Sequence, residues 1–205
     1  MADNTIKNER EQRKLYLRAR QRMILSGTIG FLVVAVIVSL LGAFGVFSPA
    51  KKAQGSKQTN YGVVTACPPE GAVSLNSSEI TLRVLNGTNK SGLGTAVGEE
   101  LRNRGFILQG VGDYESDSVM ERTEIHFGAN AITQAYTLAE QFNDAILRMD
   151  NRTDNLIDVV IGSSFNDLID TTKTPKAGTA ITALPNCVGA DQLKDVPEAS
   201  EHQAV

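Results

Sequence analysis

A run of 25 residues without a charged side chain, from Met23 to Phe47, constrains this chain more than any other feature of its sequence. About 20 apolar residues are enough to cross the hydrocarbon core of a bilayer. The run therefore predicts a transmembrane helix over 23–47. A secretory signal peptide is the alternative, with Ser48-Pro49-Ala50 as a small-residue cleavage site. An uncleaved anchor is favoured because a signal peptide has a shorter apolar region than this one.

The charges on the two sides of this run predict its orientation. Residues 1–22 hold seven of the 20 Lys and Arg and three of the 23 Asp and Glu, so residues 48–205 carry a net charge of −7. The positive-inside rule makes 1–22 a basic cytoplasmic tail and places the remainder outside the membrane. An acidic domain lacks the broad positive surface that grips nucleic acid or phosphate-rich polymers. We expect no nucleic-acid partner.

Both cysteines, Cys67 and Cys187, lie in the predicted external part. In an oxidising compartment such a pair predicts a disulfide. Here it would link the segments just before and just after the region of regular apolar periodicity. Two unrelated free thiols are the alternative. We expect no metal site, because two cysteines and two distant histidines, His126 and His202, lack ligand spacing.

Regular apolar periodicity begins at Ile80 and predicts an α+β domain over 80–170. We expect strands at 80–85, 106–111, 122–127 and 157–161. One helix should run from about Leu93 to a stop at Gly105, and a longer one from a cap at Asn130 to Ile146. The order β-α-β-β-α-β is the split βαβ arrangement of small ferredoxin-like or SPOR-like domains.

The segments around this domain lack a sustained apolar period. Residues 48–79 are rich in Ser, Gly, Lys, Asn and Pro and predict an extracytoplasmic linker. Residues 171–187 form an extension that the disulfide would close. Residues 188–205 are acidic and predict a disordered tail.

The first expected strand and helix are joined by "LNGTNKSGLGTAVG", residues 85–98. Its glycines resemble a dinucleotide fingerprint and half of a P-loop. Two observations oppose a nucleotide site: the second strand leads to another strand rather than to a helix, and Leu93-Gly94 stand where a P-loop needs Lys-Ser/Thr. We therefore expect these glycines to provide a tight turn and close helix–sheet contact.

The same turn is the candidate contact surface, with a purely structural turn as the alternative. Its backbone amides, a hydroxyl and an ammonium group are the groups that a ligand would meet. The residues are Asn86, Gly87, Thr88, Lys90 and Ser91.

No catalytic residue or cofactor is expected. Asp113, Glu115 and Asp117 alternate as calcium ligands do, but the turn glycine and closing glutamate of an EF-hand are missing, which favours a solvated acidic connector. His126 has no partner set typical of nucleophilic catalysis and is expected at the surface or rim. An envelope hydrolase or transferase using Asp113, Glu121 or Glu124 is the enzymatic alternative.

Three segments together resemble the LytR C-terminal domain family. They are "VLNGTNKSGLGTAVGEELRNRGFILQGVGD", "TEIHFGANAITQAYTLAEQF" and "DVVIGSSF". Gly94 departs from the family's usual Ala, which lowers helix propensity without disturbing the pattern. The residues that match the family pattern are Asn86, Gly87, Thr88, Gly92, Leu93, Gly105, Phe106, Thr123, Ile125, Phe127, Gly128 and Gly162.

The resemblance, which extends to stand-alone membrane-anchored actinobacterial members, implies a single-pass cell-membrane protein that supports envelope integrity. Its domain would bind peptidoglycan or an attached glycopolymer, or dock on LytR-CpsA-Psr-type or other envelope proteins. The phosphotransferase domain of many relatives has no place in this chain, so a non-catalytic role is expected. Signalling of envelope state through 1–22 is the alternative. The oligomeric state is not indicated.

Overall fold

The structure, a computed structural model, describes residues 60–205. The predicted cytoplasmic tail, the predicted transmembrane helix and the first part of the predicted linker lie outside the described residues. Within 60–205, none of the helices has the length and apolar character needed to cross a membrane.

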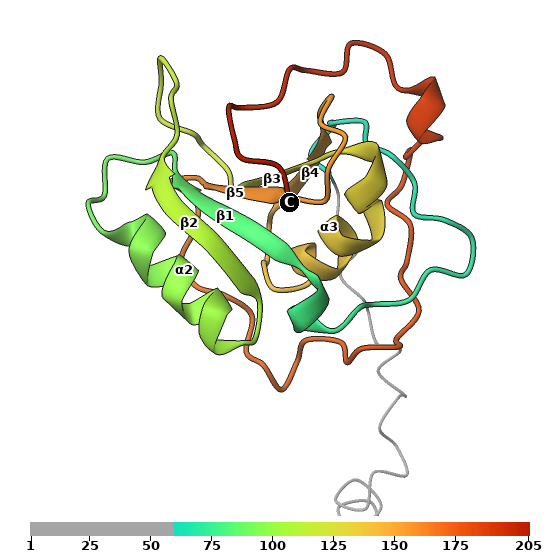
Figure 1. Ribbon diagram of the computed structural model, residues 1–205, viewed down its shortest axis with the longest axis horizontal. Coiled ribbons are helices and arrows are strands. Elements are labelled where there is room, and N and C mark those ends of the chain that lie inside the picture. Colours follow the sequence, from blue (N-terminus) through green and yellow to red (C-terminus); the bar gives the residue numbers. More distant parts are fainter. Residues whose placement is uncertain (1–59) are drawn as a thin grey trace, which may run out of the picture. The chain divides into compact units, whose positions relative to one another are not determined.

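The described chain forms an α+β domain with one five-stranded sheet and two α-helices (Figure 1). Short 3-10 helices lie at Ser77–Glu79 (η1), Ala129–Ala131 (η2) and Ala190–Gln192 (η3). The strands are β1 (Thr81–Asn86), β2 (Ile107–Asp113), β3 (Glu124–Phe127), β4 (Ile146–Met149) and β5 (Ile157–Ile161), and the helices are α2 (Leu93–Asn103) and α3 (Ile132–Ala139).

The strand order is β2-β1-β5-β3-β4, and it corrects the predicted split βαβ topology. Helix α2 connects β1 to its parallel neighbour β2, and α3 connects β3 to its parallel neighbour β4. Strand β5 lies between the two units, parallel to β1 and antiparallel to β3. The α+β class is thus confirmed, while each helix joins adjacent strands rather than strands separated by a third. The buried run Val159–Ile161 lies in the central strand, as expected.

Strand β4 was not predicted, because its apolar residues continue the spacing of the preceding helix. Helix α3 ends at Ala139, where the amides of Gln141 and Phe142 turn back to carbonyls three residues earlier. The Ile146 amide then donates to the Thr123 carbonyl at 2.8 Å, which joins β4 to β3. Asn130 does not cap α3; its carboxamide donates to the Thr153 carbonyl at 2.6 Å.

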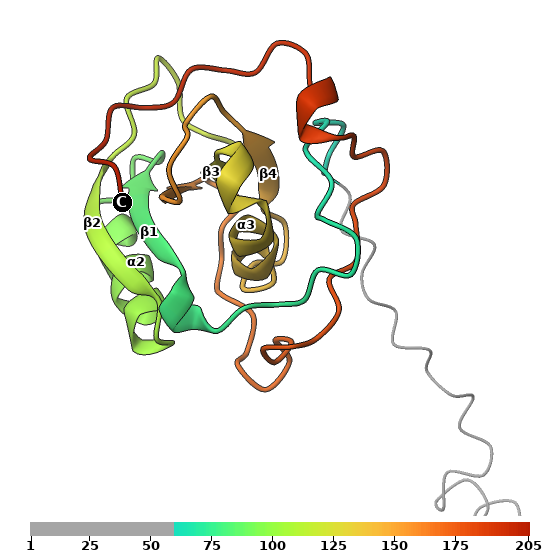
Figure 2. The ribbon, with the colours of Figure 1, turned by 45° about the vertical axis from the view of Figure 1, so that its right-hand side comes forward.

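Both helices cover the same face of the sheet (Figures 1 and 2). Alternate strand residues point into one hydrophobic core there, as the two-residue period of strands requires. The other face carries no helix in the described part, and among its residues Arg83, Asp158, Glu124, His126 and Arg148 form a charged row. The core residues on the strands are Leu82, Val84, Ile125, Phe127, Leu147, Met149, Ile157, Val159 and Ile161, and they meet Val97 and Leu101 of α2 and Ala135 and Leu138 of α3.

The flanking segments also pack on the domain, which corrects two predictions. The linker prediction fails from Asn60 onward, because the Asn60 carboxamide pairs with both backbone groups of Leu147 on the outer edge of β4. Farther along, Ala66 is fully buried and forms a parallel bridge with Val188. The tail prediction fails because residues 188–205 follow a defined path across the domain, seen in red in Figures 1 and 2.

The predicted disulfide between Cys67 and Cys187 is confirmed. It joins the segment before β1 to the segment after β5, next to the bridge between Ala66 and Val188. The disulfide thus holds together the two ends of the domain, which lie 120 residues apart in the sequence.

Candidate functional site

The Asn86 carboxamide organises the predicted contact turn. Its Oδ1 accepts hydrogen bonds from the Thr88 amide at 3.2 Å and the Thr88 hydroxyl at 2.8 Å. Its Nδ2 donates to the Lys90 carbonyl at 3.1 Å, and the Thr88 hydroxyl accepts from the Lys90 amide at 3.1 Å. The side chains of Asn86 and Thr88 therefore hold the turn in shape, as asparagine and threonine side chains commonly do in loops.

Gly87 is required here by close packing. A Cβ at this position would lie 2.6 Å from the Met120 Cγ and 2.8 Å from the Ile161 carbonyl oxygen. Its amide donates to Ile161 at 3.0 Å, and its carbonyl accepts from the Met120 amide at 2.8 Å. The turn is thereby fixed to β5 on one side and to the connector between β2 and β3 on the other.

The later glycines serve the helix–sheet contact that the sequence predicted. A Cβ at Gly98 would lie 3.0 Å from the Val111 side chain and 3.2 Å from that of Leu108, both on β2. Gly92, with φ +78°, is the N-cap of α2 in a left-handed conformation that suits glycine. Gly92 thus provides the turn into α2, and Gly98 lets α2 lie close against β2, as the sequence predicted.

A polar hollow of about 400 Å³ lies between this turn and the β2–β3 connector. It opens at the carboxyl ends of the parallel strands β1 and β2, the edge of open α/β sheets where ligands commonly bind. Of the five predicted contact residues, Asn86, Gly87 and Thr88 line it, whereas Lys90 and Ser91 do not. The remaining lining residues are Asn89, Asp113, Tyr114, Ser116, Asp117, Ser118 and Val119.

Several lining groups are available to a ligand. Within residues 60–205, the side chains of Asn89, Asp113 and Asp117 make no hydrogen bond or ion pair, and the Ser118 hydroxyl is also unused. The hollow thus offers carboxylate acceptors together with amide and hydroxyl groups, a set that suits a ligand with several neutral hydroxyl groups. Among the described residues, no group of three His, Cys, Asp or Glu side chains is placed to hold a metal ion.

Tyr114 joins the hollow to the charged row on the face without helices. Its amide donates to the Asn86 carbonyl at 3.0 Å, and its ring meets His126 edge-on with the ring centroids 5.9 Å apart. Burial, with a contribution from the Glu124 charge, raises the pKa of Tyr114, so the phenol remains neutral. His126 is 6% exposed, which corrects its predicted place at the surface.

Glu124 lies at the centre of one buried ion group on this face. It accepts from His126 at 2.8 Å and from the Arg148 guanidinium at 2.7 and 2.9 Å. Burial raises the pKa of Glu124, but the hydrogen bonds from His126 and Arg148 outweigh it and lower that pKa from 4.5 to about 2. Glu124 therefore stays ionised and serves as a structural anion.

Asp158 is the centre of a second ion group. Its carboxylate accepts two bonds of 2.8 Å from Arg83 and one of 2.9 Å from Arg152, which also pairs with Asp150. Burial raises the pKa of Asp158, but the hydrogen bond from Arg83 and the charge of Arg152 hold it below its ordinary value. This network was not predicted; the sequence signal that could have indicated it is one charged residue within each of the strand segments "TLRVL" and "IDVVI".

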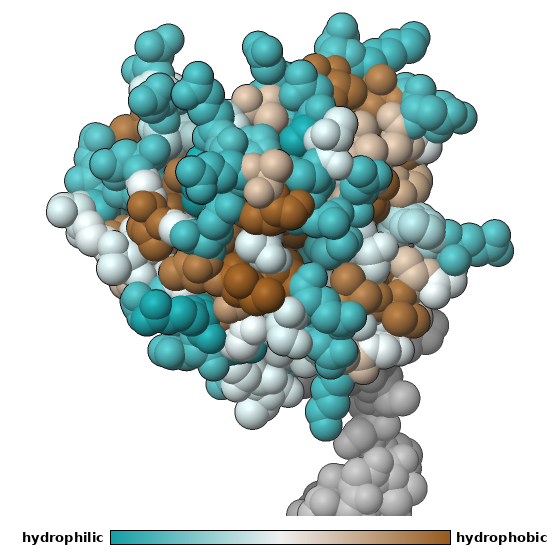
Figure 3. Space-filling view, viewed as in Figure 1, coloured by the Kyte–Doolittle hydropathy of each residue, from teal (hydrophilic) through white to brown (hydrophobic). Residues whose placement is uncertain are grey.

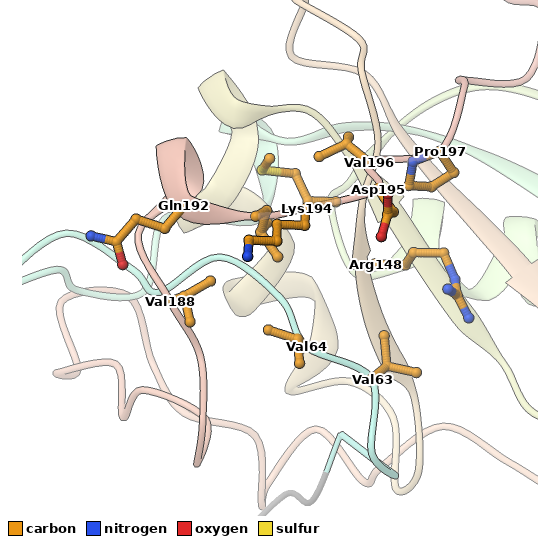
Figure 4. A pocket seen from close by; sticks show the side chains of 11 residues that line it. Val63, Val64, Arg148, Val188, Gln192, Lys194, Asp195, Val196 and Pro197 are labelled. Carbon is orange, nitrogen blue, oxygen red and sulfur yellow. The ribbon is translucent and has the colours of Figure 1, made fainter.

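A second hollow, of about 450 Å³, was not foreseen from the sequence because segments far apart in the chain form it (Figure 4). It lies between residues 63–64, the outer edge of β4 and residues 188–197. Its walls are mostly aliphatic, and Figure 4 shows the Lys194 side chain reaching across it. Figure 3 shows one face of the molecule, on which hydrophilic surface is interrupted by apolar patches.

The five-stranded sheet with two helices on one face, closed by a disulfide, defines the described part of the chain as a small α+β domain. A family model described as LytR cell envelope-related transcriptional attenuator (LytR_C) matches residues 79–165, just under half of the chain. The match confirms the resemblance stated from the sequence. It contains every residue that lines the polar hollow, whereas most of the second hollow lies outside it.

No curated protein matches the chain. One solved structure that it resembles is the soluble domain of a conserved hypothetical secreted protein (Rv2700 ortholog) from Mycobacterium marinum. The two are 22% identical, the likeness covers 54% of this chain and 82% of the other, and the TM-score is 0.47.

Proposed function

We propose that this chain is a non-catalytic, single-pass membrane protein of the cell envelope whose external domain binds neutral cell-wall glycan. The polar hollow between 86–89 and 113–119 is the observation that carries the proposal. Neutral sugars present many hydroxyl groups, and the unused carboxylates and amide of this hollow are suitable partners for them.

Three further observations support an envelope location. The family description that matches residues 79–165 refers to the cell envelope. The disulfide between Cys67 and Cys187 persists in an oxidising compartment such as the outside of the membrane. The uncharged run at 23–47, preceded by basic residues, fits an anchor with its amino-terminal side in the cytoplasm.

The negative net charge of the domain favours an uncharged ligand in the cell wall over an anionic one. Residues 48–205 carry a net charge of −7, and the hollow contains Asp113 and Asp117 without an opposing cation in its lining. Like charges disfavour a phosphate-bearing polymer in such a place. The glycan strand of peptidoglycan fits better than an anionic polymer attached to it.

Co-sedimentation of the detergent-solubilised full chain with purified cell wall tests this proposal. We expect the wild-type chain to sediment with wall from which anionic polymers have been stripped. Asp117→Asn should reduce binding about tenfold, because a hydrogen bond to a charged group contributes roughly 1.5–3 kcal/mol. Asp191→Asn is the matched control, since Asp191 is an exposed carboxylate in η3 outside the hollow.

Two results would contradict the proposal. One is a wild-type chain that stays in the supernatant with stripped wall. The other is an equal loss of binding in Asp117→Asn and Asp191→Asn, which would indicate a general charge effect.

A further inference from the structure

The last residues of the chain are held on the face of the sheet that carries no helix. Four residues at two-residue intervals form hydrogen bonds to the domain through their backbone groups. The Pro197 carbonyl accepts from the Asn151 amide at 3.0 Å, and the Ala199 amide donates to the Asn151 carboxamide at 2.9 Å. The Glu201 carbonyl accepts from Arg83 at 2.7 Å, and the Gln203 carbonyl accepts from Gln109 at 3.0 Å.

The residues that receive this segment span the sheet. Asn151 follows β4 at one edge, Arg83 lies on β1, and Gln109 lies on β2 at the other edge. Figures 1 and 2 show the red segment crossing in this direction, from η3 toward β1 and β2. We call Asn151, Asp154, Arg83 and Gln109 the tail track.

Arg83 is oriented in advance for this contact. Its Nε and one terminal nitrogen are bound to Asp158, which leaves the other terminal nitrogen to donate to the Glu201 carbonyl. A donor that is already fixed loses little freedom when an acceptor arrives. Of the tail, Asn151, Arg83 and Gln109 contact only backbone groups, so they place few demands on the sequence of the bound segment.

One contact of the track does depend on the sequence. The His202 ring bonds to the Asp154 carboxylate at 3.0 Å through Nε2 and to the Ser200 carbonyl at 2.7 Å through Nδ1. The track therefore favours a segment with a histidine or another hydrogen-bond donor opposite Asp154.

The tail is attached with little burial, although the His202 side chain is only 14% exposed. Leu193 and Val196 pack on the core, but no residue from Pro197 to Val205 is buried. The hydrogen bonds of Ala199, Glu201 and Gln203 are exposed. Such bonds contribute little net stability, because water replaces them when they break and ordering a chain costs entropy. A segment held in this way exchanges readily with a competitor.

We infer that the tail track is a docking site for an unstructured polypeptide segment of a partner protein, and that residues 197–205 occupy this site within the same chain. The partner segment would offer backbone carbonyls to Arg83 and Gln109 and a donor side chain to Asp154. This site is distinct from the polar hollow and does not depend on glycan binding.

Fluorescence anisotropy with a labelled peptide of residues 197–205 tests this inference. The peptide is expected to bind saturably to the detergent-solubilised chain truncated after Val196. It should bind the intact chain at least tenfold more weakly, because the attached tail competes at a high effective concentration. In the truncated chain, Gln109→Ala and Asp154→Asn should weaken binding several-fold, and Asn155→Ala, an exposed residue outside the track, should not.

A point variant provides the same test without truncation. His202→Ala in the intact chain should loosen the tail and increase peptide binding over wild type. The inference is overturned if neither the truncated chain nor this variant binds the peptide. It is also overturned if soluble glycan fragments, rather than peptide, displace the tail.

Discussion

Asn86 and Gly87 show how two residues set the geometry of the candidate site. Asn86 is the last residue of β1, and its carboxamide closes the turn through Thr88 and Lys90. Gly87 brings the turn against Met120 and Ile161. The hollow therefore has a rigid wall, and the groups free to meet a ligand lie beside that wall at Asn89 and on the connector.

Gly87→Ala tests this packing. We expect a loss of about 1–3 kcal/mol in the free energy of unfolding, because the added methyl group would overlap the Ile161 carbonyl oxygen and the Met120 side chain. Chemical denaturation followed by circular dichroism measures it. Gly110→Ala is the control, since no atom lies within 4 Å of a Cβ there; equal losses would contradict the packing argument.

At the residue scale, sequence reasoning located the turn but misjudged His126. The glycine pattern predicted a tight turn and close helix–sheet contact, and both are present. His126 was expected at the surface because polar alternation on a strand usually marks a solvated face. It is buried because Glu124 and Tyr114 lie against it, and these partners come from tertiary packing that periodicity does not encode.

Each of the two ion groups joins side chains from different strands, so its contribution to stability depends on how the strands pack together. Asp158 on β5 binds Arg83 on β1 and Arg152 beyond β4, and the side chains of Asp158 and Arg152 are 0% exposed. Asp158→Asn should lower the free energy of unfolding by about 3–5 kcal/mol, because it leaves buried guanidinium charge without its partner.

The matched control for this variant is an exposed ion pair. Glu99→Gln removes the partner of Arg102 on the surface of α2, where pairs contribute about 0–1 kcal/mol. Urea denaturation of both variants compares them. Similar losses in the two would contradict the structural role assigned to Asp158.

The ion group around Glu124 predicts an acid-sensitive stability. The pKa of Glu124 is about 2 in the folded state and 4.5 ordinarily, so the folded state favours the ionised form. Its stabilisation is present above about pH 4.5 and is lost as the pH falls toward 2. Glu124→Gln should therefore unfold more easily than wild type at pH 6, and this difference should shrink between pH 4.5 and 2 in denaturation curves. A difference that is constant with pH would contradict the assignment.

The sequence predicted most elements but not their full connection. The strands at 81–86, 107–113, 124–127 and 157–161 and the first helix lie close to where periodicity placed them. Strand β4 was read as the end of α3, because Ile146 and its neighbours satisfy a helical spacing as well as a strand. Without β4, the pattern implied a split topology in place of two β-α-β units that lie on either side of β5.

At the scale of the whole molecule, the segments outside the family-matched region complete the domain. Residues 60–79 and 171–205 were expected to be largely linker, extension and disordered tail, yet Ala66 and Leu184 are buried and the Cys67–Cys187 disulfide joins the two sides. Composition alone missed this order because many of the contacts involve backbone groups. The lining of the second hollow arises from the same wrapping.

Loss of the disulfide should affect the stability of the whole domain. Replacing Cys67 and Cys187 by serine should lower the free energy of unfolding by about 4–5 kcal/mol, the chain-entropy value for a loop of this length. Thermal unfolding of the variant and of the reduced wild type measures this loss. An unchanged melting temperature would contradict the view that the flanking segments are part of the folded unit.

The central claim is that the domain binds neutral envelope glycan in the hollow at the ends of β1 and β2. Titration of the isotope-labelled, detergent-solubilised chain with soluble neutral peptidoglycan glycan fragments, followed residue by residue by NMR, tests it most directly. The account predicts saturable shifts concentrated at residues 86–89 and 113–119, and their loss in Asp117→Asn. Shifts elsewhere in the domain, or none at saturating glycan, would contradict it.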